Sequence, residues 1–207
     1  THRLLGLAPD GWMGPLFGQS HAGGRRDIPE GRMIWVAHEV LASGSSVVLD
    51  FGCWSADERY AIRVIAETAG ADFTLEYVHT SEEERRRRAA TRWLEAPNTT
   101  FEMTDADHDR FLASIELPSR EELDNGPIPS PPPGHNTWPA WASWTWQTLP
   151  VTTLPAADGA ARPSRDAHPR RRGAPASPRT APPPPAAASR GGGGVALLGP
   201  RQGQRPG

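Results

Sequence analysis

The clearest pattern in the chain is an apolar run, Val47 to Leu49, that ends on the acidic Asp50. Consecutive apolar residues with no polar alternation predict a short strand covered on both faces, as in a parallel sheet. A carboxylate directly after such a strand stands where α/β proteins bind ligands, and in phosphate-handling proteins it often holds Mg²⁺. The alternative is that Asp50 caps the turn into the next helix. On the residues alone, both roles remain open.

A helical pattern precedes this strand. Apolar residues recur at helical spacing from Met33 to Leu41, and Gly44 follows as a stop signal. Asp27 is expected to cap the free amides at the helix start, with Glu30 standing three residues after the cap. One amphipathic helix therefore leads directly into the strand.

The same order of elements repeats after the strand. Ser55 followed by Glu58 is a capping box, an apolar stripe follows, and Gly70 ends the second helix. From Phe73 to Tyr77, apolar residues alternate with polar ones, which predicts a strand nearer the sheet edge. Strands that alternate with helices predict an α/β fold built on a parallel sheet with right-handed crossovers.

The next predicted helix, EEERRRRAATRWLE, is the most charged in the protein. Arg85, Arg88 and Arg92 are spaced so that they project from one helix face. Guanidinium groups on one helix can clamp a polyphosphate and offset charge in a phosphoryl-transfer transition state. The alternative is a solvated helix whose leading glutamates pair with the arginines that follow them.

Signals in the flanking regions are weaker. A short strand or loop is expected to end near Asp10, and the glycine-rich Gly14 to Gly24 is expected to be irregular. Further helix starts are predicted by capping pairs and by the sequence PSREEL; the pairs are Ser81 with Glu84 and Thr104 with Asp107. The tryptophans between Trp138 and Trp146 predict a hydrophobic latch onto the body, with a base-stacking platform as the alternative.

Composition divides the chain near Pro150. All 15 Phe, Trp and Tyr residues precede it, and the rest is rich in Pro, Ala, Gly and Arg. We therefore expect one domain over residues 1–150 and a disordered tail over residues 151–207. The body is acidic and the tail basic, so the tail, with its RRR at 170–172, could contact nucleic acid by charge. The alternatives are a solvated extension and an out-of-frame translation.

Several classes of protein are disfavoured. Cys53 is the single cysteine, which excludes an intramolecular disulfide, and the scattered histidines give no zinc-site spacing. No signal-type start and no apolar run of bilayer length occur, so no membrane partner is expected and a soluble cytoplasmic protein is the prediction.

Taken together, the motifs carry a resemblance over about residues 4–150. The segments that carry it are APDGWM, GPLFG, AGGRRD, EGRMIW, VVLDFGCWSADER, the RxxxR pair of Arg88 and Arg92, RWLEAPNTTFEMT and WASWTW. Their succession resembles bacterial ATP-binding proteins of the AAA-type P-loop kinase group, which are similar to polynucleotide kinases, zeta toxins and chloramphenicol phosphotransferases. The resemblance implies a P-loop NTPase fold, with ATP and Mg²⁺ as cofactors and an unidentified hydroxyl compound as the acceptor.

The resemblance also implies site residues. VVLDFG corresponds to the Walker-B-like strand, which puts Asp50 near Mg²⁺. The helix with Arg85, Arg88 and Arg92 corresponds to the lid over the ATP phosphates. Asp10 corresponds to the acidic residue that orients or deprotonates the acceptor hydroxyl.

The sequence departs from the family pattern in its phosphate loop. It contains no GxxxxGK[ST] motif and no Lys, and Ala8 and Gly11 differ from the usual TPDEW. The chain is therefore expected to be an N-terminally truncated member, a partial P-loop kinase-like sheet with impaired ATP binding and phosphoryl transfer. The rival interpretation is a non-enzymatic remnant or interaction protein whose basic tail contacts nucleic acid.

Overall fold

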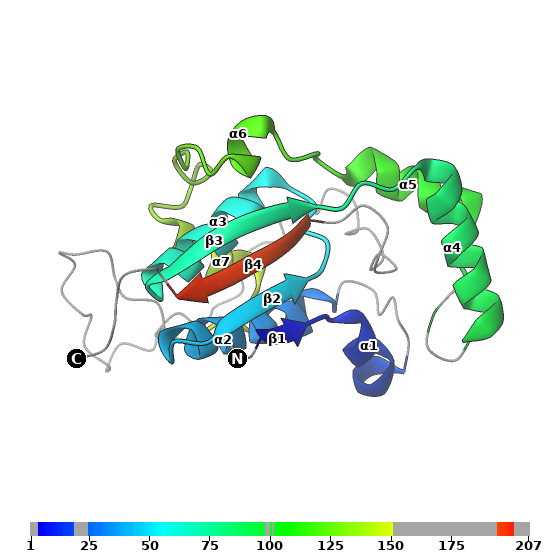
Figure 1. The fold of residues 1–207 in the computed structure, drawn as a ribbon, viewed down its shortest axis with the longest axis horizontal. Coiled ribbons are helices and arrows are strands. Elements are labelled where there is room, and N and C mark those ends of the chain that lie inside the picture. The colour runs from blue at the N-terminus through cyan, green and yellow to red at the C-terminus, as the bar shows by residue number, and fades with distance from the viewer. Residues whose placement is uncertain (1–3, 19–24, 98–99, 101, 151–193, 201–207) are drawn as a thin grey trace, which may run out of the picture.

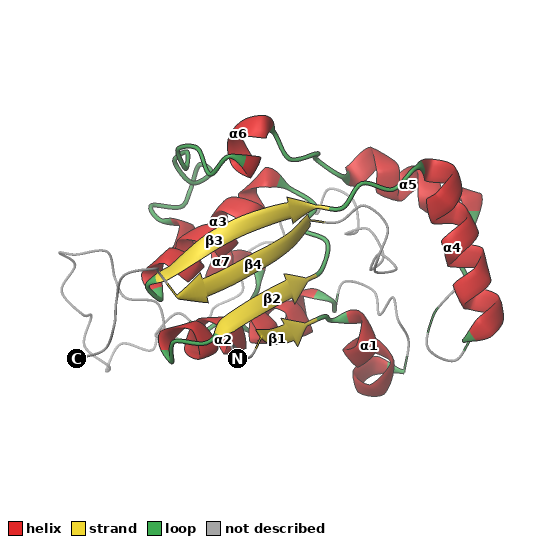
Figure 2. Ribbon diagram, viewed as in Figure 1, coloured by secondary structure: helices red, strands yellow, loops and turns green. Residues whose placement is uncertain are grey.

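The computed structural model describes residues 4–18, 25–97, 100 and 102–150, together with the backbone of residues 194–200. These form a sheet with helices around it (Figures 1 and 2). In chain order the elements are β1 (Leu4–Leu7), α1 (Asp10–Phe17), α2 (Asp27–Ala42), β2 (Ser46–Asp50), α3 (Ala56–Thr68), β3 (Ala71–Tyr77), α4 (Glu82–Glu95), α5 (Asp105–Ser114), α6 (Arg120–Leu123), α7 (Trp138–Thr145) and β4 (Gly194–Pro200).

The described strands lie in the order β1-β2-β4-β3. β1 pairs parallel with β2, in a register that sets Leu7 beside Leu49. β4 runs antiparallel to both of its neighbours, β2 and β3, so β1, β2 and β3 share one direction. The expected α/β architecture with a parallel sheet is confirmed for β1, β2 and β3, and β4 is an added antiparallel strand. A strand from the end of the chain fills the position between β2 and β3 against the common direction.

β4 also corrects part of the expected tail. Residues 194–200 lie within the segment predicted to be disordered, yet their backbone pairs with β2 on one side and with β3 on the other. Composition misses this strand because it joins an existing sheet through backbone hydrogen bonds and needs no core of its own. Residues 151–193 and 201–207, including the RRR at 170–172, lie outside the described residues, so their disorder and nucleic-acid contact stay predictions.

The core lies between the sheet and the helices α2, α3 and α7, which stand behind the strands in Figure 2. Val47 and Leu49 are buried there, whereas Ser46, Val48 and Asp50 alternate with them and stay partly exposed. β2 is therefore not equally covered on its two faces, because a pleated strand sends alternate side chains to opposite sides.

The tryptophan latch is confirmed. Trp138 and Trp141 on α7 and Trp146 directly after it are buried in the core, and Trp141 stacks edge-on against both of the others. Trp144 is 68% exposed and contacts the His135 ring instead of the core. The cluster is a packing device, and three buried indoles leave no platform for bases.

Three helix starts are as predicted from their capping boxes. Ser55 with Glu58 opens α3 and Thr104 with Asp107 opens α5, while the predicted turn in PSREEL is α6, opened by Ser119 with Glu122. The residues involved exchange backbone and side-chain hydrogen bonds within four positions, so tertiary packing does not decide them.

Two other predicted starts need correction. At α4, Ser81 accepts from the Glu84 amide, but the Glu84 carboxylate binds Arg87 and Arg88 and does not return to the cap. At α2, Asp27 is the first helical residue and not the cap, because backbone turns from Arg25 and Arg26 already accept the first helical amides.

The N-terminal region is more ordered than its glycines suggest. The expected strand near Asp10 is β1, but residues 14–17, predicted to be irregular, belong to α1. Gly18 then adopts a φ of 71°, which stops the helix in the left-handed region that suits glycine. Residues 19–24 lie outside the described residues. Within the described part of the chain, none of the helices combines the length and apolar character needed to cross a bilayer.

Candidate functional site

The carboxyl ends of β1, β2 and β3 share one edge of the sheet (Figure 1). Asp50 is the last residue of β2, and Asp10 opens α1 just beyond the end of β1. Because β1 and β2 are direct neighbours in register, the fold brings these two predicted site residues to adjacent strand ends. α4, which carries the predicted arginines, follows β3 from the same edge.

Asp50 is available for a ligand. The alternative role as a helix cap is wrong, because Ser55 caps α3 with its own hydroxyl and Glu58 completes the box. The Asp50 side chain is partly exposed, on the opposite side of β2 from Leu49, and no hydrogen bond or ion pair reaches it from the described residues.

The donor set at Asp50 suits one kind of metal. Among residues 4–18, 25–97, 100 and 102–150, no group of three or more His, Cys, Asp or Glu is arranged to hold a metal ion. A fully protein-bound cation is therefore not built there. Mg²⁺, in contrast, is usually held by one or two carboxylates, with phosphate oxygens and water completing its shell. Asp50 fits that second arrangement.

Asp10 belongs to a chain of polar contacts. Arg26 Nη1 donates to Asp10 Oδ1 at 2.6 Å, and Arg26 Nε donates to Glu30 Oε1 at 2.8 Å. Trp146 Nε1 donates to the other Glu30 oxygen at 3.3 Å. The side chains of Arg26 and Glu30 are 12% and 11% exposed, and that of Asp10 is 24% exposed. The chain therefore runs from the core to the carboxyl edge of the sheet.

Burial changes the ionisation of the carboxyls behind this edge. Burial raises the pKa of Glu30 to about 7 although Arg26 opposes the shift, and the charge of Glu58 adds to it. Burial likewise raises the pKa of Glu58 to about 6, against its hydrogen bonds from backbone amides. The buried Cys53 thiol, close to both carboxyls, has its pKa raised by burial first and then by their charges. Cys53 is thus kept as a neutral thiol.

The arginine helix stands apart from the core. α4 contains no buried residue. Glu82 pairs with Arg85 and Arg86, and Glu84 pairs with Arg87 and Arg88, with Arg88 Nε at 2.5 Å from Glu84 Oε1. These hydrogen bonds from Arg87 and Arg88 lower the pKa of Glu84 to about 2. The solvated-helix alternative describes these pairs well.

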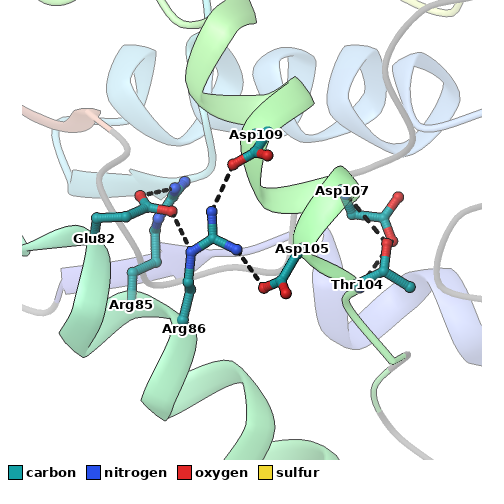
Figure 3. Close-up of polar contacts among 7 residues, drawn as sticks. All are labelled: Glu82, Arg85, Arg86, Thr104, Asp105, Asp107 and Asp109. Carbon is teal, nitrogen blue, oxygen red and sulfur yellow. Dashed lines mark hydrogen bonds and ion pairs between the residues drawn. The ribbon is translucent and has the colours of Figure 1, made fainter.

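One arginine ties α4 to a neighbouring helix. Figure 3 shows Arg86 between Asp105 and Asp109 of α5, donating at 2.5 Å and 2.6 Å while also holding Glu82. In the same view Arg85 pairs with Glu82. Of the predicted site residues, Arg88 has a side chain that is 53% exposed, whereas that of Arg85 is 16% exposed. Burial lowers the pKa of His108 on α5, and the Arg85 charge helps to lower it. Arg92 has further interactions of its own.

The sequence reasoning missed a second buried arginine, Arg59. Its guanidinium donates to both Glu122 oxygens, at 2.8 Å and 3.3 Å, and to the carbonyls of Cys53 and Glu116, at 3.0 Å and 2.9 Å. Burial alone raises the pKa of Glu122, but this ion pair and the Ser119 amide lower it overall. Arg59 ties the loop after β2, through the Cys53 carbonyl, to Glu116 and Glu122 in the segment around the start of α6.

The geometry agrees with what the comparisons show. A family model described as AAA domain matches residues 7–118, which is more than half of the chain. The chain belongs to the AAA domain family. Its members are P-loop nucleotide-binding proteins of ATPase and kinase type, so nucleotide handling is the coarse function of this chain. No curated protein and no solved structure matches it.

The matched range is informative about the site. It contains Asp10, Asp50 and the three predicted arginines of α4. It also contains Arg26 and Glu30, but it ends before α6 and the tryptophan latch, so Trp146 lies outside it. The contact between Glu30 and Trp146 therefore joins the AAA domain to a segment beyond the family match.

Proposed function

We propose that this member of the AAA domain family binds Mg·ATP at the carboxyl edge of its sheet, and that the chemistry of the site is transfer of the γ-phosphoryl group to a hydroxyl acceptor. The observation that carries the proposal is the placement of Asp50 and Asp10 on the adjacent ends of β2 and β1. The sequence resemblance to polynucleotide kinases, zeta toxins and chloramphenicol phosphotransferases supports the choice of kinase chemistry within the family.

Each residue has a distinct role in this proposal. Asp50 supplies the protein carboxylate for Mg²⁺, which neutralises phosphate charge when it is bound. Asp10 accepts the hydrogen bond of the acceptor hydroxyl, orients its oxygen in line with the γ-phosphorus, and takes the proton as the new P–O bond forms. The bond from the γ-phosphorus to the bridging oxygen breaks, and ADP leaves with that oxygen.

The α4 arginines can serve as phosphate clamps despite their present partners. Arg85 and Arg88 are each held by a glutamate of their own helix, and the Arg88 side chain is 53% exposed while that of Arg85 is 16% exposed. Ion pairs at a solvated surface are weak and screened by salt, so a polyphosphate with several charges can displace the glutamates. Arg92 lies one turn further on the same face and completes the set.

The proposal also concerns how tightly this chain binds nucleotide. The 207 residues contain no Lys and no GxxxxGK[ST] motif, so the P-loop lysine that reaches the β and γ phosphates has no counterpart among them. We infer weak binding and impaired transfer. Isothermal titration with Mg·ATP tests this directly: dissociation constants above about 100 μM are expected, and micromolar binding contradicts the inference.

A pair of variants tests the arginine roles in the same titration. Arg92→Ala removes a proposed clamp, and we expect it to weaken Mg·ATP binding about tenfold, the effect of one charge-assisted hydrogen bond. Arg87→Ala is the matched control, because Arg87 is 65% exposed and lies off the face of Arg85, Arg88 and Arg92. Equal affinities for the two variants would remove the lid assignment.

A further inference from the structure

The contacts behind Asp10 form a continuous path across three parts of the fold. Asp10 begins α1, Arg26 lies in the turn before α2, and Glu30 lies in the first turn of α2. Trp146 follows α7 and is 116 residues from Glu30 in the sequence. Each link is a direct hydrogen bond between side chains, at 2.6, 2.8 and 3.3 Å from Asp10 inward.

The inner end of this path is rigidly packed. Trp146 is 2% exposed and stacks against Trp141 at a ring separation of 6.0 Å. Gly31, next to Glu30, lies so close to residues 146–149 that an added Cβ would stand 2.5 Å from Thr148 Oγ1 and 3.1 Å from Leu149 N. Glu30 is therefore held by α2 and by the latch at once, and its carboxylate has little freedom to turn.

Each carboxylate oxygen of Glu30 has its own donor. Oε1 accepts from Arg26 Nε and Oε2 accepts from Trp146 Nε1. The Arg26 guanidinium is planar and uses a separate nitrogen, Nη1, for Asp10, so fixing its Nε edge also fixes the direction of Nη1. A long arginine side chain without such a partner would sample many rotamers. Glu30 thus holds the Arg26 guanidinium whose Nη1 binds the Asp10 carboxylate.

We propose that Glu30 and Arg26 are positioning residues that orient the Asp10 carboxylate toward the acceptor hydroxyl, with Trp146 as their anchor. This inference rests on the proposed function, in which Asp10 is the acceptor base. It adds that the segment after α7, beyond the family match, sets the geometry of the acceptor side. Asp10 alone touches the acceptor, and the other residues act through it.

The path has a natural reporter, because Glu30 titrates near neutral pH. The ionisable groups that face Glu30 are Arg26 beside it, Glu58 from α3, and, across Arg26, Asp10; the Cys53 thiol after β2 is also close. Loss of the Glu30 proton changes how the Arg26 charge is shared between two carboxylates. A change at Glu30 should therefore be visible at both ends of the path, at the Trp146 indole and at the Asp10 carboxyl carbon.

The test is a pH titration of the full 207-residue chain, followed by NMR. The Trp146 indole N–H signal is assigned by its absence in Trp146→Phe, and the Asp10 carboxyl carbon by its absence in Asp10→Asn. In the wild-type chain both signals should shift with one shared midpoint near pH 7. In Glu30→Gln, which keeps the shape of the side chain, that shared transition should vanish from both.

The matched control is Glu67→Gln. Arg63 and Glu67 form another arginine–glutamate pair four residues apart on a helix, at 2.9 Å, without a contact to Asp10. This variant should keep the shared transition. Separate midpoints in the wild-type chain, or a transition that survives in Glu30→Gln, would overturn the proposal, and the wild-type result decides even if Glu30→Gln fails to fold.

A second measurement distinguishes failure of the positioning role from failure of the proposed function. Phosphoryl transfer from Mg·ATP to water or an added alcohol is measured for wild type, Glu30→Gln and Asp10→Asn. A linked titration with no effect of Asp10→Asn on transfer removes the role of Asp10 as base but keeps the path. Loss of transfer in Asp10→Asn with full rate and unchanged pH profile in Glu30→Gln removes the positioning role and keeps the function.

Discussion

Two networks of arginine and carboxylate side chains flank the carboxyl edge of the sheet, and they differ in burial. Arg26 and Arg59 lie in the body, where each binds partners from distant segments, Asp10 and Glu122 among them. The arginines of α4 mostly pair within their own helix, and Arg87 and Arg88 are 65% and 53% exposed. The buried network fixes positions, while the exposed network can exchange its partners for a ligand.

The difference follows from dielectric surroundings. A buried guanidinium that loses its carboxylate leaves an uncompensated charge, so the pair is expensive to break. An exposed pair is replaced by water at little cost. Catalytic groups that must be held need the first environment, and groups that must grip and release polyphosphate need the second. The two networks therefore match the two roles proposed for this edge.

The largest effect should follow from breaking the Arg59 network. Arg59→Ala leaves the buried Glu122 carboxylate and two backbone carbonyls without their donor, which should lower the free energy of unfolding by about 3–5 kcal/mol. Urea denaturation followed by circular dichroism measures it. Arg87→Ala, at an exposed position, should leave the urea midpoint in place, and equal losses in the two variants would end the distinction between the networks.

The pH dependence of stability sharpens the comparison at Glu30. Its pKa rises from 4.5 to about 7 on folding because of burial, so the folded chain holds this proton more tightly than the unfolded one. The contribution of Glu30 to stability should therefore be fully present below about pH 4.5 and fall by about 3 kcal/mol as pH rises to about 7. Glu58 adds a smaller fall up to about pH 6.

Glu30→Gln isolates the part due to Glu30. Because the variant has no ionisable group at position 30, its unfolding free energy should fall less than that of wild type between pH 5 and 7.5, while the Glu58 part remains. Urea titrations at a series of pH values measure both proteins. Parallel pH profiles would show that Glu30 is ionised in the folded chain as it is in the unfolded one.

A smaller effect should come from the junction between α2 and the latch. Gly31→Ala places a methyl group 2.5 Å from Thr148 Oγ1, and the overpacking should cost about 1–3 kcal/mol. Gly11→Ala is the control, since nothing lies within 4 Å of its added Cβ. Thermal unfolding should separate the two variants, with Gly11→Ala at or above wild type. No loss in Gly31→Ala would show that residues 146–149 do not pack on α2.

The smallest effect on global stability is expected at Arg86. Its bonds to Asp105 and Asp109 tie α4 to α5 at an exposed site, so Arg86→Ala should leave the urea midpoint almost unchanged. It should instead raise amide hydrogen exchange in α4 and α5, and added salt should do the same to wild type. Arg120→Ala, at an isolated exposed pair, is the control. Equal amide exchange in wild type, Arg86→Ala and Arg120→Ala would show that the Arg86 bonds do not hold α4 against α5.

Local signals predicted the helices better than the site. Ser55 and Thr104 were readable as caps because their partners lie three residues away. Glu30 was interpreted through the same rule and assigned to a cap, but its carboxylate binds Arg26 and Trp146. The spacing of Arg26 and Glu30 was a usable signal for an ion pair. The contact with Trp146 was not readable, since only the folded sheet brings it to α2.

In the sheet, too, local sequence predicted a strand but not its long-range pairing. Val47 to Asp50 predicted a strand with a carboxylate at its end, and β2 is that strand. The apolar run from Val195 to Leu198 was a local strand signal that the overall composition of the tail concealed. The place of β4 between β2 and β3 was not predictable from it, because that place depends on pairing across more than a hundred residues. The burial of Arg59 could not be predicted from the sequence either, because its partner Glu122 comes from a distant segment of the chain.

The proposed metal site can be located directly with Mn²⁺ in place of Mg²⁺. Mn·ATP is added to the isotope-labelled chain, and paramagnetic broadening of backbone signals reports the position of the ion. Broadening should centre on the end of β2 around Asp50, extend to the start of α1, and be lost in Asp50→Asn but kept in the control Asp72→Asn. Broadening centred elsewhere, or unchanged in Asp50→Asn, would contradict the assignment of this edge as the nucleotide site.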